Sequence, residues 1–309
     1  LLILLFLLIF CMLLEISSIA LALLAFDLFL NPTIFDDNQI ISLEENGLPN
    51  DMNEIIKLGE SGLDKINDIN HYKVKSIETN LVKIVAPIPR PTRNIMCVGK
   101  NYHDHAAEFH NSGFDSSGKQ AVASFPVIFT KATTSVIGTE DDIILANDYT
   151  NTTDYEGELG LILGSGGKNI QSDDAYGKVF GYTVINDVSA RQIQRQHEQW
   201  FIGKSPDTYC PMGPVIVTAD EIDDVTKLKI ETRVNGETRQ SSYIRNLIFD
   251  IPNLISTISK TMTFETADII ATGTPAGVGI GSNPPVYLKS GDKIEVEIEK
   301  IGILRNKIA

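Results

Sequence analysis

Residues 154–163, DYEGELGLIL, begin with three acidic side chains and continue as an apolar run that is typical of a buried strand. Because side chains alternate across a strand, Glu156 and Glu158 project from one face, about 7 Å apart along the chain. A second apolar run, GYTVIND at residues 181–187, ends on Asp187. A strand face turned to water is one interpretation of the two glutamates. If the two runs bring all three carboxylates together, the cluster needs a cation.

Hard oxygen ligands of this kind favour Mg²⁺, Mn²⁺ or Ca²⁺. Three carboxylates on a six-coordinate ion leave about three positions for water and for substrate oxygens. The pattern therefore predicts an open, catalytic metal site formed by Glu156, Glu158 and Asp187. Every functional expectation below depends on the convergence of these three side chains.

Short runs rich in β-branched residues recur from residue 94 onward, separated by Gly, Pro, Asn and Asp. These expected strands are Val127–Thr130, Ile143–Leu145, Leu159–Leu163, Val179–Ile185, Val215–Val217, Lys229–Val234, Ile269–Ala271 and Lys293–Ile298. Helical patterns are limited to residues 102–109, 189–199 and 250–260. There is no βαβ alternation and no Gly-rich phosphate loop. The sequence predicts a strand-rich α+β fold.

With 309 residues, 43% of them hydrophobic, the chain is long enough for one large domain or two smaller ones. Residues 86–93, APIPRPTR, carry three prolines and favour extended backbone, so they indicate a linker. We expect a small N-terminal subdomain with this linker over residues 31–90, including an amphipathic stretch at residues 52–63. The catalytic domain is expected over residues 91–309.

Residues 1–30 form a separate apolar segment. Residues 1–26 are apolar apart from one glutamate and two serines, close to the roughly 20 apolar residues that span a bilayer. No Lys or Arg precedes Lys57, so the basic region of a secretory leader is missing. A membrane anchor, a leader, a non-native extension and a buried helix all stay open. We expect a cytoplasmic protein, with membrane tethering or an organelle as the alternatives.

The chain carries 40 Asp and Glu against 26 Lys and Arg, a formal charge of −14, and such a surface repels phosphate backbones. Nucleic acid is therefore excluded as an expected partner. The three cysteines include no Cys-x-x-Cys pair, which argues against a disulfide framework and against a thiolate zinc site. This cysteine usage fits a reducing compartment.

Residues 98–108, VGKNYHDHAAE, predict a helix with Asn101 as its N-cap. His105 and Glu108 are three residues apart and therefore neighbours on one helix face. The carboxylate can hold one ring nitrogen and leave the other to accept a proton. A surface ion pair is the plainer interpretation. A zinc pair of His103 and His105 is weaker, because residues two apart diverge on a helix and no third nitrogen or sulfur ligand is apparent.

Six motifs in order, spread over roughly residues 94–305, closely resemble the fumarylacetoacetate hydrolase family, in its acylpyruvase and 2-hydroxyhepta-2,4-diene-1,7-dioate isomerase-like branch. They are CVGKNYHDHAAE at 97–108, DYEGE at 154–158, GYTVINDVSAR at 181–191, GKSPDT at 203–208, PMGP at 211–214 and TGTPAGVG at 272–279. The resemblance implies a mixed β-roll assembled as a homodimer. It also implies a divalent metal, Mg²⁺ or Mn²⁺, bound by Glu156, Glu158 and Asp187.

The resemblance assigns further roles by position. His105 and Glu108 match a pair that activates water, and Lys204 matches a lysine that contacts the anionic end of the substrate. Gln194 matches a glutamine that stabilises the developing oxyanion in some members. Thr274 matches a residue that helps to hold the substrate carboxylate.

Two features near these motifs, the turn from Gly273 to Gly281 and the side chain of Arg191, can each be interpreted in two ways. The turn from Gly273 to Gly281 is either a tight turn between strands or a source of backbone N–H groups for a carboxylate. Arg191 is either paired with a carboxylate of the protein or in contact with the substrate. Residues 111–120 and 191–200 are candidate lid segments.

The sequence therefore predicts a metal-dependent hydrolase that cleaves a carbon–carbon bond in a β-diketo acid such as an acylpyruvate. The alternative uses the same metal site as an isomerase or decarboxylase of a 2-oxo or 2-hydroxy dicarboxylate, such as hydroxyheptadienedioate or oxaloacetate. A hypothesis from another class is a membrane-tethered binding protein without catalytic activity. The expected partner is a small oxo-acid substrate.

Overall fold

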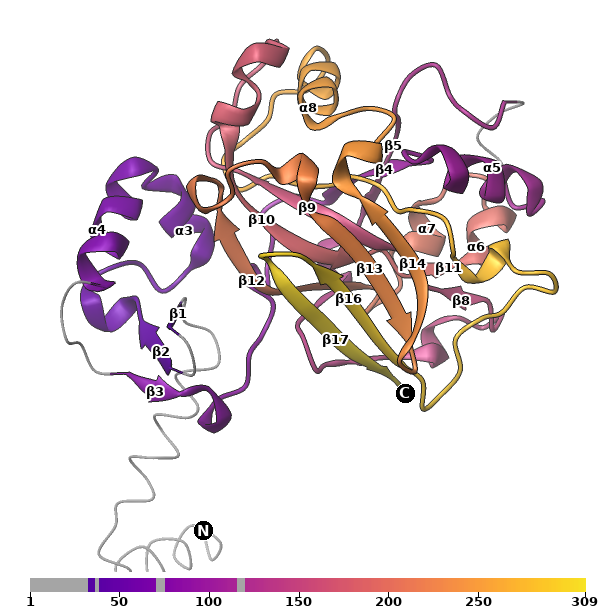
Figure 1. Ribbon diagram of the computed structural model, residues 1–309, viewed down its shortest axis with the longest axis horizontal. Coiled ribbons are helices and arrows are strands. Elements are labelled where there is room, and N and C mark those ends of the chain that lie inside the picture. The colour runs from indigo at the N-terminus through magenta and orange to yellow at the C-terminus, as the bar shows by residue number, and fades with distance from the viewer. Residues whose placement is uncertain (1–32, 37–38, 71–75, 116–119) are drawn as a thin grey trace, which may run out of the picture. The chain divides into compact units, whose positions relative to one another are not determined.

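The structure is a computed structural model that describes residues 33–36, 39–70, 76–115 and 120–309 (Figure 1). Of these, the residues up to Ile55 together with Glu60–Ile84 form one compact unit, and Ile56–Gly59 with Val85–Ala309 form a second. The apolar segment expected at residues 1–30 lies outside the described residues. Within the described residues, no helix has both the length and the apolar character needed to cross a membrane.

The first unit combines a small antiparallel sheet with helices. Its strands are β1 (Thr33–Asp36), β2 (Gln39–Ser42) and β3 (Ile77–Glu78), and its helices are α4 (Glu60–Asn70) and most of α3 (Met52–Lys57), whose last two residues belong to the second unit. The single amphipathic stretch expected at residues 52–63 is thus two helices. Gly59 separates them with a φ of +57°, a backbone conformation that suits glycine and ends a helix.

The second unit is built on a seven-stranded sheet in the order β5-β4-β15-β9-β10-β12-β6. Its strands are β4 (Ile95–Gly99), β5 (Val127–Lys131), β6 (Val136–Ile137), β9 (Gly157–Leu163), β10 (Val179–Asn186), β12 (Cys210–Thr218) and β15 (Ile269–Ala271). The pairs β15–β4 and β12–β6 are parallel and the others are antiparallel. The sheet is therefore mixed, and its central strands β9 and β10 are buried along their whole length.

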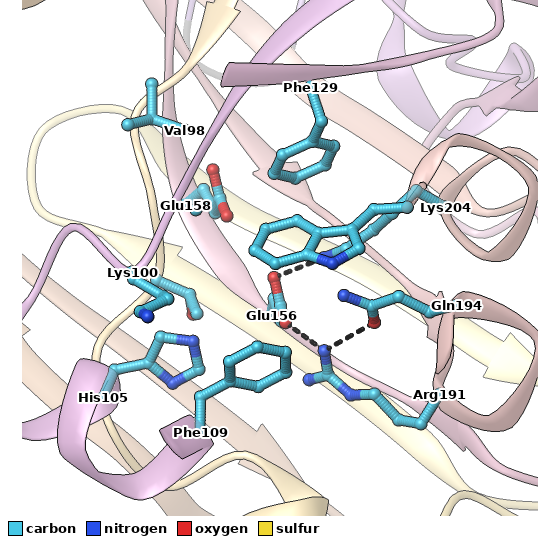
Figure 2. Close-up of a pocket in the computed structure, with 13 residues that line it drawn as sticks. Val98, Lys100, His105, Phe109, Phe129, Glu156, Glu158, Arg191, Gln194 and Lys204 are labelled. Carbon is cyan, nitrogen blue, oxygen red and sulfur yellow. Dashed lines mark hydrogen bonds and ion pairs between the residues drawn. The ribbon is translucent and has the colours of Figure 1, made fainter. Parts of the chain in front are cut away.

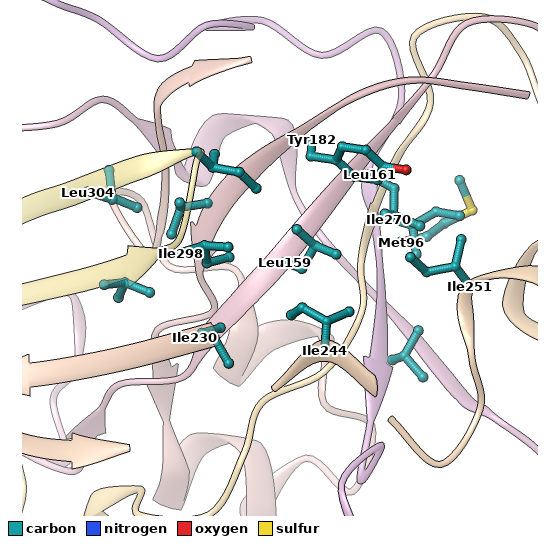
Figure 3. Packing of buried hydrophobic residues seen from close by; sticks show 14 of the residues in the cluster. Met96, Leu159, Leu161, Tyr182, Ile230, Ile244, Ile251, Ile270, Ile298 and Leu304 are labelled. Carbon is teal, nitrogen blue, oxygen red and sulfur yellow. The ribbon is translucent and has the colours of Figure 1, made fainter. Parts of the chain in front are cut away.

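A five-stranded sheet, in the order β14-β13-β16-β17-β7, packs across the β9–β10 pair (Figure 1). Its strands are β7 (Asp142–Ile143), β13 (Lys229–Val234), β14 (Glu237–Tyr243), β16 (Lys293–Ile298) and β17 (Gly302–Ile308). Buried and more exposed positions alternate along β13, so one face meets the core and the other meets solvent. Leu159 and Leu161 of β9 lie in one apolar cluster with Ile230 and Ile298 (Figure 3).

The remaining elements of the second unit are a small sheet of β8 (Thr153–Asp154) and β11 (Ser189–Ala190) and the helices α5 (His103–Asn111), α6 (Arg191–Gln196), α7 (Phe201–Lys204) and α8 (Ile251–Ser259). Short 3₁₀ turns join many of the elements. The strand-rich α+β architecture expected from the sequence is confirmed.

Two local expectations were wrong. The helical pattern at residues 189–199 begins as strand β11, and only Arg191–Gln196 is α-helical. Asn101 does not cap helix α5, because its Oδ1, the atom that would accept from the helix, accepts instead from the Phe249 N–H at 2.7 Å. Tyr102 occupies the cap position without a side-chain hydrogen bond.

Candidate active site

Three buried carboxylates meet where β9 begins and β10 ends. The antiparallel register pairs Glu158 with Ile185, so Asp187, the first residue after β10, lies beside Glu156. The Asp187 N–H donates to the Glu156 carbonyl oxygen at 2.8 Å. Ligand atoms of Glu156, Glu158 and Asp187 lie within 4.8 Å of one another. The structure thus brings together the three side chains on which the sequence-based hypothesis depends.

Three buried cations surround two of these carboxylates. The Lys204 ammonium group lies 2.8 Å from Glu156 Oε2 and 2.7 Å from Asp187 Oδ2. Lys131 Nζ contacts Asp187 Oδ1 at 2.7 Å, and Arg191 Nη1 contacts Glu156 Oε1 at 2.5 Å. Glu156 and Asp187 therefore each face two positive charges.

Glu158 has a different environment. Its Oε2 accepts a hydrogen bond from the Gly273 N–H at 2.8 Å, and among the described residues no cation pairs with it. Burial raises its pKa well above the usual value, and the charges of Asp187 and Glu156 raise it further. Burial also acts to raise the pKa of Glu156, but Lys204 and Arg191 outweigh it and hold that pKa low.

The charges of this cluster do not balance. Asp154, whose Oδ2 accepts from Arg191 Nε at 2.9 Å, joins the three glutamate and aspartate side chains as a fourth buried carboxylate. Four carboxylates face three cations, and the carboxylate left over is Glu158. A divalent ion bound by Glu156, Glu158 and Asp187 would supply the missing charge, and hard oxygen donors suit Mg²⁺ or Mn²⁺. The residues present therefore fit a divalent metal.

His105 and Glu108, the two residues expected to act as an acid/base pair, are in contact on helix α5. His105 is buried, and its Nδ1 lies 3.2 Å from Glu108 Oε2. The Gly277 N–H holds the same carboxylate, at 3.1 and 3.2 Å from its two oxygens. With Nδ1 engaged, Nε2 is the ring nitrogen left for the pocket, which His105 lines together with Glu156 (Figure 2). The zinc pair is not formed, since His103 is exposed whereas His105 is buried.

Gln194 and Arg191 lie side by side on the pocket wall. Arg191 Nη1 donates to Gln194 Oε1 at 3.5 Å (Figure 2), and within the described part of the chain the Gln194 amide nitrogen has no hydrogen-bond partner. A free N–H donor suits the expected contact with an oxyanion. The Arg191 guanidinium is engaged by Asp154 and Glu156, which favours the structural one of its two interpretations.

The turn from Gly273 to Gly281 binds carboxylates, but they belong to the protein. Its N–H groups contact Glu158 from Gly273 and Glu108 from Gly277. The Thr274 hydroxyl donates to the Gly157 carbonyl at 2.9 Å and accepts from Gln240 Nε2 at 2.7 Å. Gly273 and Thr274 were expected to bind the substrate. The Gly273 N–H and the Thr274 hydroxyl instead form hydrogen bonds within the protein, although Thr274 lines the pocket.

Apolar side chains close the rest of the pocket. Trp200 meets Phe109 and Phe129 edge-on, with ring centroids 5.6 and 5.2 Å apart. Gly99 must stay small, because a Cβ atom there would overlap the Trp200 ring. These aromatic side chains and Lys131 were not among the expected site residues. The only sequence signal for Lys131 is a charged residue that ends an apolar strand.

The candidate lid segments are placed in part. Residues 191–200 include helix α6 and Trp200, which lines the pocket. In the other segment, residues 116–119 lie outside the described residues. The Lys100 ammonium group, on the pocket wall, donates to Asp115 Oδ2 at 2.8 Å and to the Gln120 carbonyl at 3.0 Å. Lys100 thus connects Asp115 and Gln120, the described residues on either side of 116–119, to the pocket wall.

The site thus combines a mixed, strand-rich fold with a buried carboxylate cluster that fits a divalent metal and with a neighbouring histidine–glutamate pair. Residues 94–309 match the family model described as fumarylacetoacetate (FAA) hydrolase C-terminal. The chain therefore belongs to the fumarylacetoacetate hydrolase family, and the resemblance drawn from the motifs is confirmed.

The relatives of this chain are enzymes of that family. The oxaloacetate tautomerase YisK of Bacillus subtilis is 51% identical over 228 residues, which cover 74% of this chain and 73% of the relative. The mitochondrial oxaloacetate tautomerase FAHD2A of Bos taurus is 40% identical over 266 residues, which cover 85% and 81%.

Solved structures agree with the fold. A fumarylacetoacetate hydrolase from Exiguobacterium antarcticum has a TM-score of 0.76 and 41% identity, over 89% of this chain and 94% of its own. A maleylpyruvate hydrolase from Sphingobium, solved with manganese(II) and pyruvate, has a TM-score of 0.74 and 28% identity, over 90% and 95%. The relatives thus span tautomerases and hydrolases, and the tautomerases favour the isomerase alternative over the hydrolase expected first.

Proposed function

We propose that this protein is a divalent-metal-dependent tautomerase of oxaloacetate or a closely similar 2-oxo dicarboxylate. The observation that carries the proposal is the His105–Glu108 contact, which lies in one pocket with the carboxylate cluster. The sequence relatives add the substrate, since the relative with 51% identity is an oxaloacetate tautomerase. Tautomerisation needs only one proton to be moved, and His105, whose Nε2 faces the pocket, is placed to move it.

The chemistry follows from the side chains around the pocket. His105 Nε2 removes a proton from C3, the C2–C3 double bond forms, and the proton is returned to the oxygen on C2, so that no atom is gained or lost. Glu108, bound to Nδ1, stabilises the imidazolium that forms between the two transfers. The Gln194 amide nitrogen donates to the oxygen on which negative charge develops. A divalent metal held by Glu156, Glu158 and Asp187 supplies Lewis-acid stabilisation of that charge.

The charge of the site also suits a dicarboxylate. The described cluster has one carboxylate more than it has cations, and a divalent ion turns this excess into one net positive charge. A substrate dianion is attracted to such a site, and the low polarity of the Phe109, Phe129 and Trp200 wall strengthens the attraction. Lys204, one of the three cations in this balance, lies between Glu156 and Asp187 and lines the pocket.

Hydrolysis of a β-diketo acid is the second candidate, because the maleylpyruvate hydrolase with 28% identity shares the fold. The same His105–Glu108 pair would then take a proton from water and not from carbon. The two reactions, and oxaloacetate decarboxylation, are separated by measuring all three rates on the same preparation with Mg²⁺ and with Mn²⁺. We expect the enol and keto forms of oxaloacetate to interconvert fastest; faster cleavage of an acylpyruvate overturns the proposal.

His105→Gln tests the assigned base. Loss of a general acid/base typically lowers a rate by about 10²- to 10⁴-fold, so we expect kcat to fall within that range. The Kd for Mn²⁺, measured by titration calorimetry, should stay unchanged because the carboxylate cluster is intact. His103→Gln is the matched control, since it changes an exposed histidine on the same helix. Activity that persists in His105→Gln contradicts the assignment.

The assembly and the location of the protein are separate proposals. A homodimer, expected from the family resemblance, predicts about twice the 34.0 kDa chain mass by light scattering. A cytoplasmic or organellar enzyme fits the relatives, one of which is mitochondrial. The alternative of a silent, membrane-tethered binding protein predicts partition with membranes and no metal-dependent turnover, and soluble active protein overturns it.

A further inference from the structure

The Gly273–Gly281 turn has a third carboxylate partner to which the proposed reaction gives no role. The Gly273 N–H donates to Glu158 of the carboxylate cluster, and the Gly277 N–H donates to Glu108, the partner of His105. Further along the turn, after Gly277, the N–H groups of Gly279 and Ile280 both donate to Asp154. One short turn therefore joins Glu158 and Glu108 to a buried aspartate that does not itself line the pocket.

Asp154 is saturated with donors. Its Oδ1 accepts from the backbone N–H groups of Tyr155 and Gly279 at 2.9 and 2.7 Å. Its Oδ2 accepts from the Ile280 N–H at 3.1 Å and from Arg191 Nε at 2.9 Å. The side chain is fully buried, so these bonds are not exchanged with water and fix its two oxygens against both partners.

The turn fits closely around its carboxylates. A Cβ atom on Gly279 would lie 2.7 Å from Asp154 Oδ1 and would overlap the Val286 carbonyl, and one on Gly281 would overlap the Glu108 carboxylate. The Tyr155 hydroxyl donates to the Gly277 carbonyl at 2.9 Å, which holds the turn from a second side. A shift of the turn by a fraction of an ångström must therefore move Glu108, and with it His105.

The other partner of Asp154 leads to the opposite wall of the pocket. Arg191 contacts Asp154 through Nε, and its Nη1 reaches Glu156 and Gln194 (Figure 2). Asp154 thus contacts the turn that holds the base and also the arginine that holds the oxyanion donor and one metal ligand.

We infer that Asp154 is a positioning residue that sets the place of the His105–Glu108 pair relative to Gln194 and Glu156. The inference rests on the proposed function for its effect on rate. Proton transfer depends steeply on the separation of the base and the carbon, and a misplacement of about 1 Å can cost about 10²-fold. Asp154 fixes that separation through its contacts with the Gly279–Ile280 backbone and with Arg191.

Asp154→Asn is the first test. The amide keeps the size of the side chain but turns one acceptor into a donor, which then faces N–H groups. We expect kcat to fall by about 10- to 100-fold, the range typical of supporting residues around a metal site. The KM for substrate and the Kd for Mn²⁺ should change little, because Arg191 keeps its contact with Glu156. A purely structural role would instead reduce the amount of folded protein and leave the kcat of that fraction unchanged.

Asp268→Asn is the matched control. Asp268 is also a buried aspartate that pairs with an arginine, Arg93, at 2.9 Å and accepts from a backbone N–H, that of Glu265, at 2.8 Å. It does not line the pocket, so its variant should keep the wild-type kcat. An equal loss of kcat in both variants overturns the inference.

A double-mutant cycle tests the route. If Asp154 acts through the turn and Glu108, then Asp154→Asn should cost much less in a Glu108→Gln background than in the wild type. Full additivity of the two losses overturns the inference. Tyr155→Phe removes one hydrogen bond from the same turn and replaces Asp154→Asn as the test if that variant does not fold. We expect Tyr155→Phe to lower kcat by several-fold. An unchanged kcat contradicts the inference.

Hydrogen exchange provides a measurement that needs no substrate. Amides of residues 273–281 should exchange faster in Asp154→Asn than in the wild type, and those in Asp268→Asn should not. If the wild-type protein does not turn over oxaloacetate, the proposed function fails while this measurement still decides whether Asp154 orders the turn. Unchanged exchange in Asp154→Asn overturns the inference, as does faster exchange together with an unchanged kcat.

Discussion

Two clusters of charged side chains in the same domain are built on opposite plans. The buried cluster places Lys131, Arg191 and Lys204 among four carboxylates at the ends of β9 and β10. The outer cluster lies on β13, β16 and β17, where Arg233 contacts Glu231, Glu295 and Glu297 at 2.8–3.0 Å. Lys229 and Arg305 complete it, so three cations face three carboxylates.

The difference shows how burial decides what a charge cluster is for. On the partly exposed sheet face, water screens each pair, and the balanced charges require no further ligand. In the pocket, where screening is weak, an unbalanced carboxylate is costly unless a cation joins it. Glu158 is that carboxylate, and its raised pKa reflects the cost. The buried cluster is incomplete in a way that a divalent ion corrects, and the outer cluster is complete by itself.

The same substitution in each cluster should give the largest contrast. Glu158→Gln keeps the shape and the Gly273 hydrogen bond but removes the charge that distinguishes the site. Lewis-acid stabilisation amounts to several kcal/mol, so we expect kcat/KM to fall by about 10³-fold or more. The Kd for Mn²⁺, from titration calorimetry, should rise in parallel.

Glu295→Gln, in the outer cluster, is the control, and we expect wild-type turnover from it. The metal-free Glu158→Gln protein should melt no lower than the metal-free wild type, because an unpaired buried charge is removed. Wild-type affinity for Mn²⁺ in the Glu158→Gln protein is incompatible with the comparison.

The second-largest effect is expected on the free energy of unfolding, when the buried cation Lys131 is removed. Lys131 is completely buried and donates to Asp187, to the Val188 carbonyl at 2.9 Å and to the Lys204 carbonyl. Loss of one partner of a buried ion pair typically costs about 3–5 kcal/mol, so Lys131→Met should lower the metal-free free energy of unfolding by about that amount. Added Mn²⁺ should restore part of the loss, because its charge compensates Asp187.

Chemical denaturation with and without Mn²⁺ measures both effects. Lys229→Met, which removes a cation from the outer cluster, should leave the unfolding curve unchanged. A Lys131→Met protein as stable as the wild type without metal would show that burial is not what separates the two clusters.

Much of the fold was predictable because the core strands carry their own signal. The runs expected at Lys229–Val234, Ile269–Ala271 and Lys293–Ile298 coincide with β13, β15 and β16. Strand β14 was missed because its sequence, ETRQSSY, has no apolar alternation. It lies at the edge of its sheet, where only one neighbouring strand has to be matched, so polar side chains are tolerated.

In the site, as in the fold, some residues carry a local sequence signal and others do not. Alternation along one strand and the end of the next made Glu156, Glu158 and Asp187 candidates, and helix spacing did the same for His105 and Glu108. Their roles came from the family resemblance, because a solvated strand face and a surface ion pair fitted the same local patterns. Contacts that depend on the packing of distant segments carried no local signal, and Lys131 was missed for that reason. The carboxylates bound by the Gly273–Gly281 turn were also unpredictable, since spacing does not show whether an N–H group faces a substrate or another part of the chain.

The smallest expected effect comes from the centre of the outer cluster. Arg233 lies directly across from Glu295 in the β13–β16 register, and its side chain is 17% exposed. Hydrogen bonds from Arg233, opposed by partial burial, lower the pKa of Glu295. Because the folded pKa lies below the unfolded one, the pair stabilises the fold above the unfolded pKa and loses that contribution as the pH falls through the folded pKa.

Solvent screening keeps this contribution small, so Arg233→Met should lower the free energy of unfolding at pH 7 by less than about 1 kcal/mol. The difference from the wild type should narrow in high salt, and it should narrow again as the pH falls toward the range in which Glu295 is protonated. Urea denaturation at two salt concentrations and a series of pH values measures both trends. Turnover should be unaffected, because the cluster neither lines the pocket nor contacts the residues that do. A loss as large as that expected for Lys131→Met, or one insensitive to salt, would mean that the exposed face is as poorly screened as the pocket.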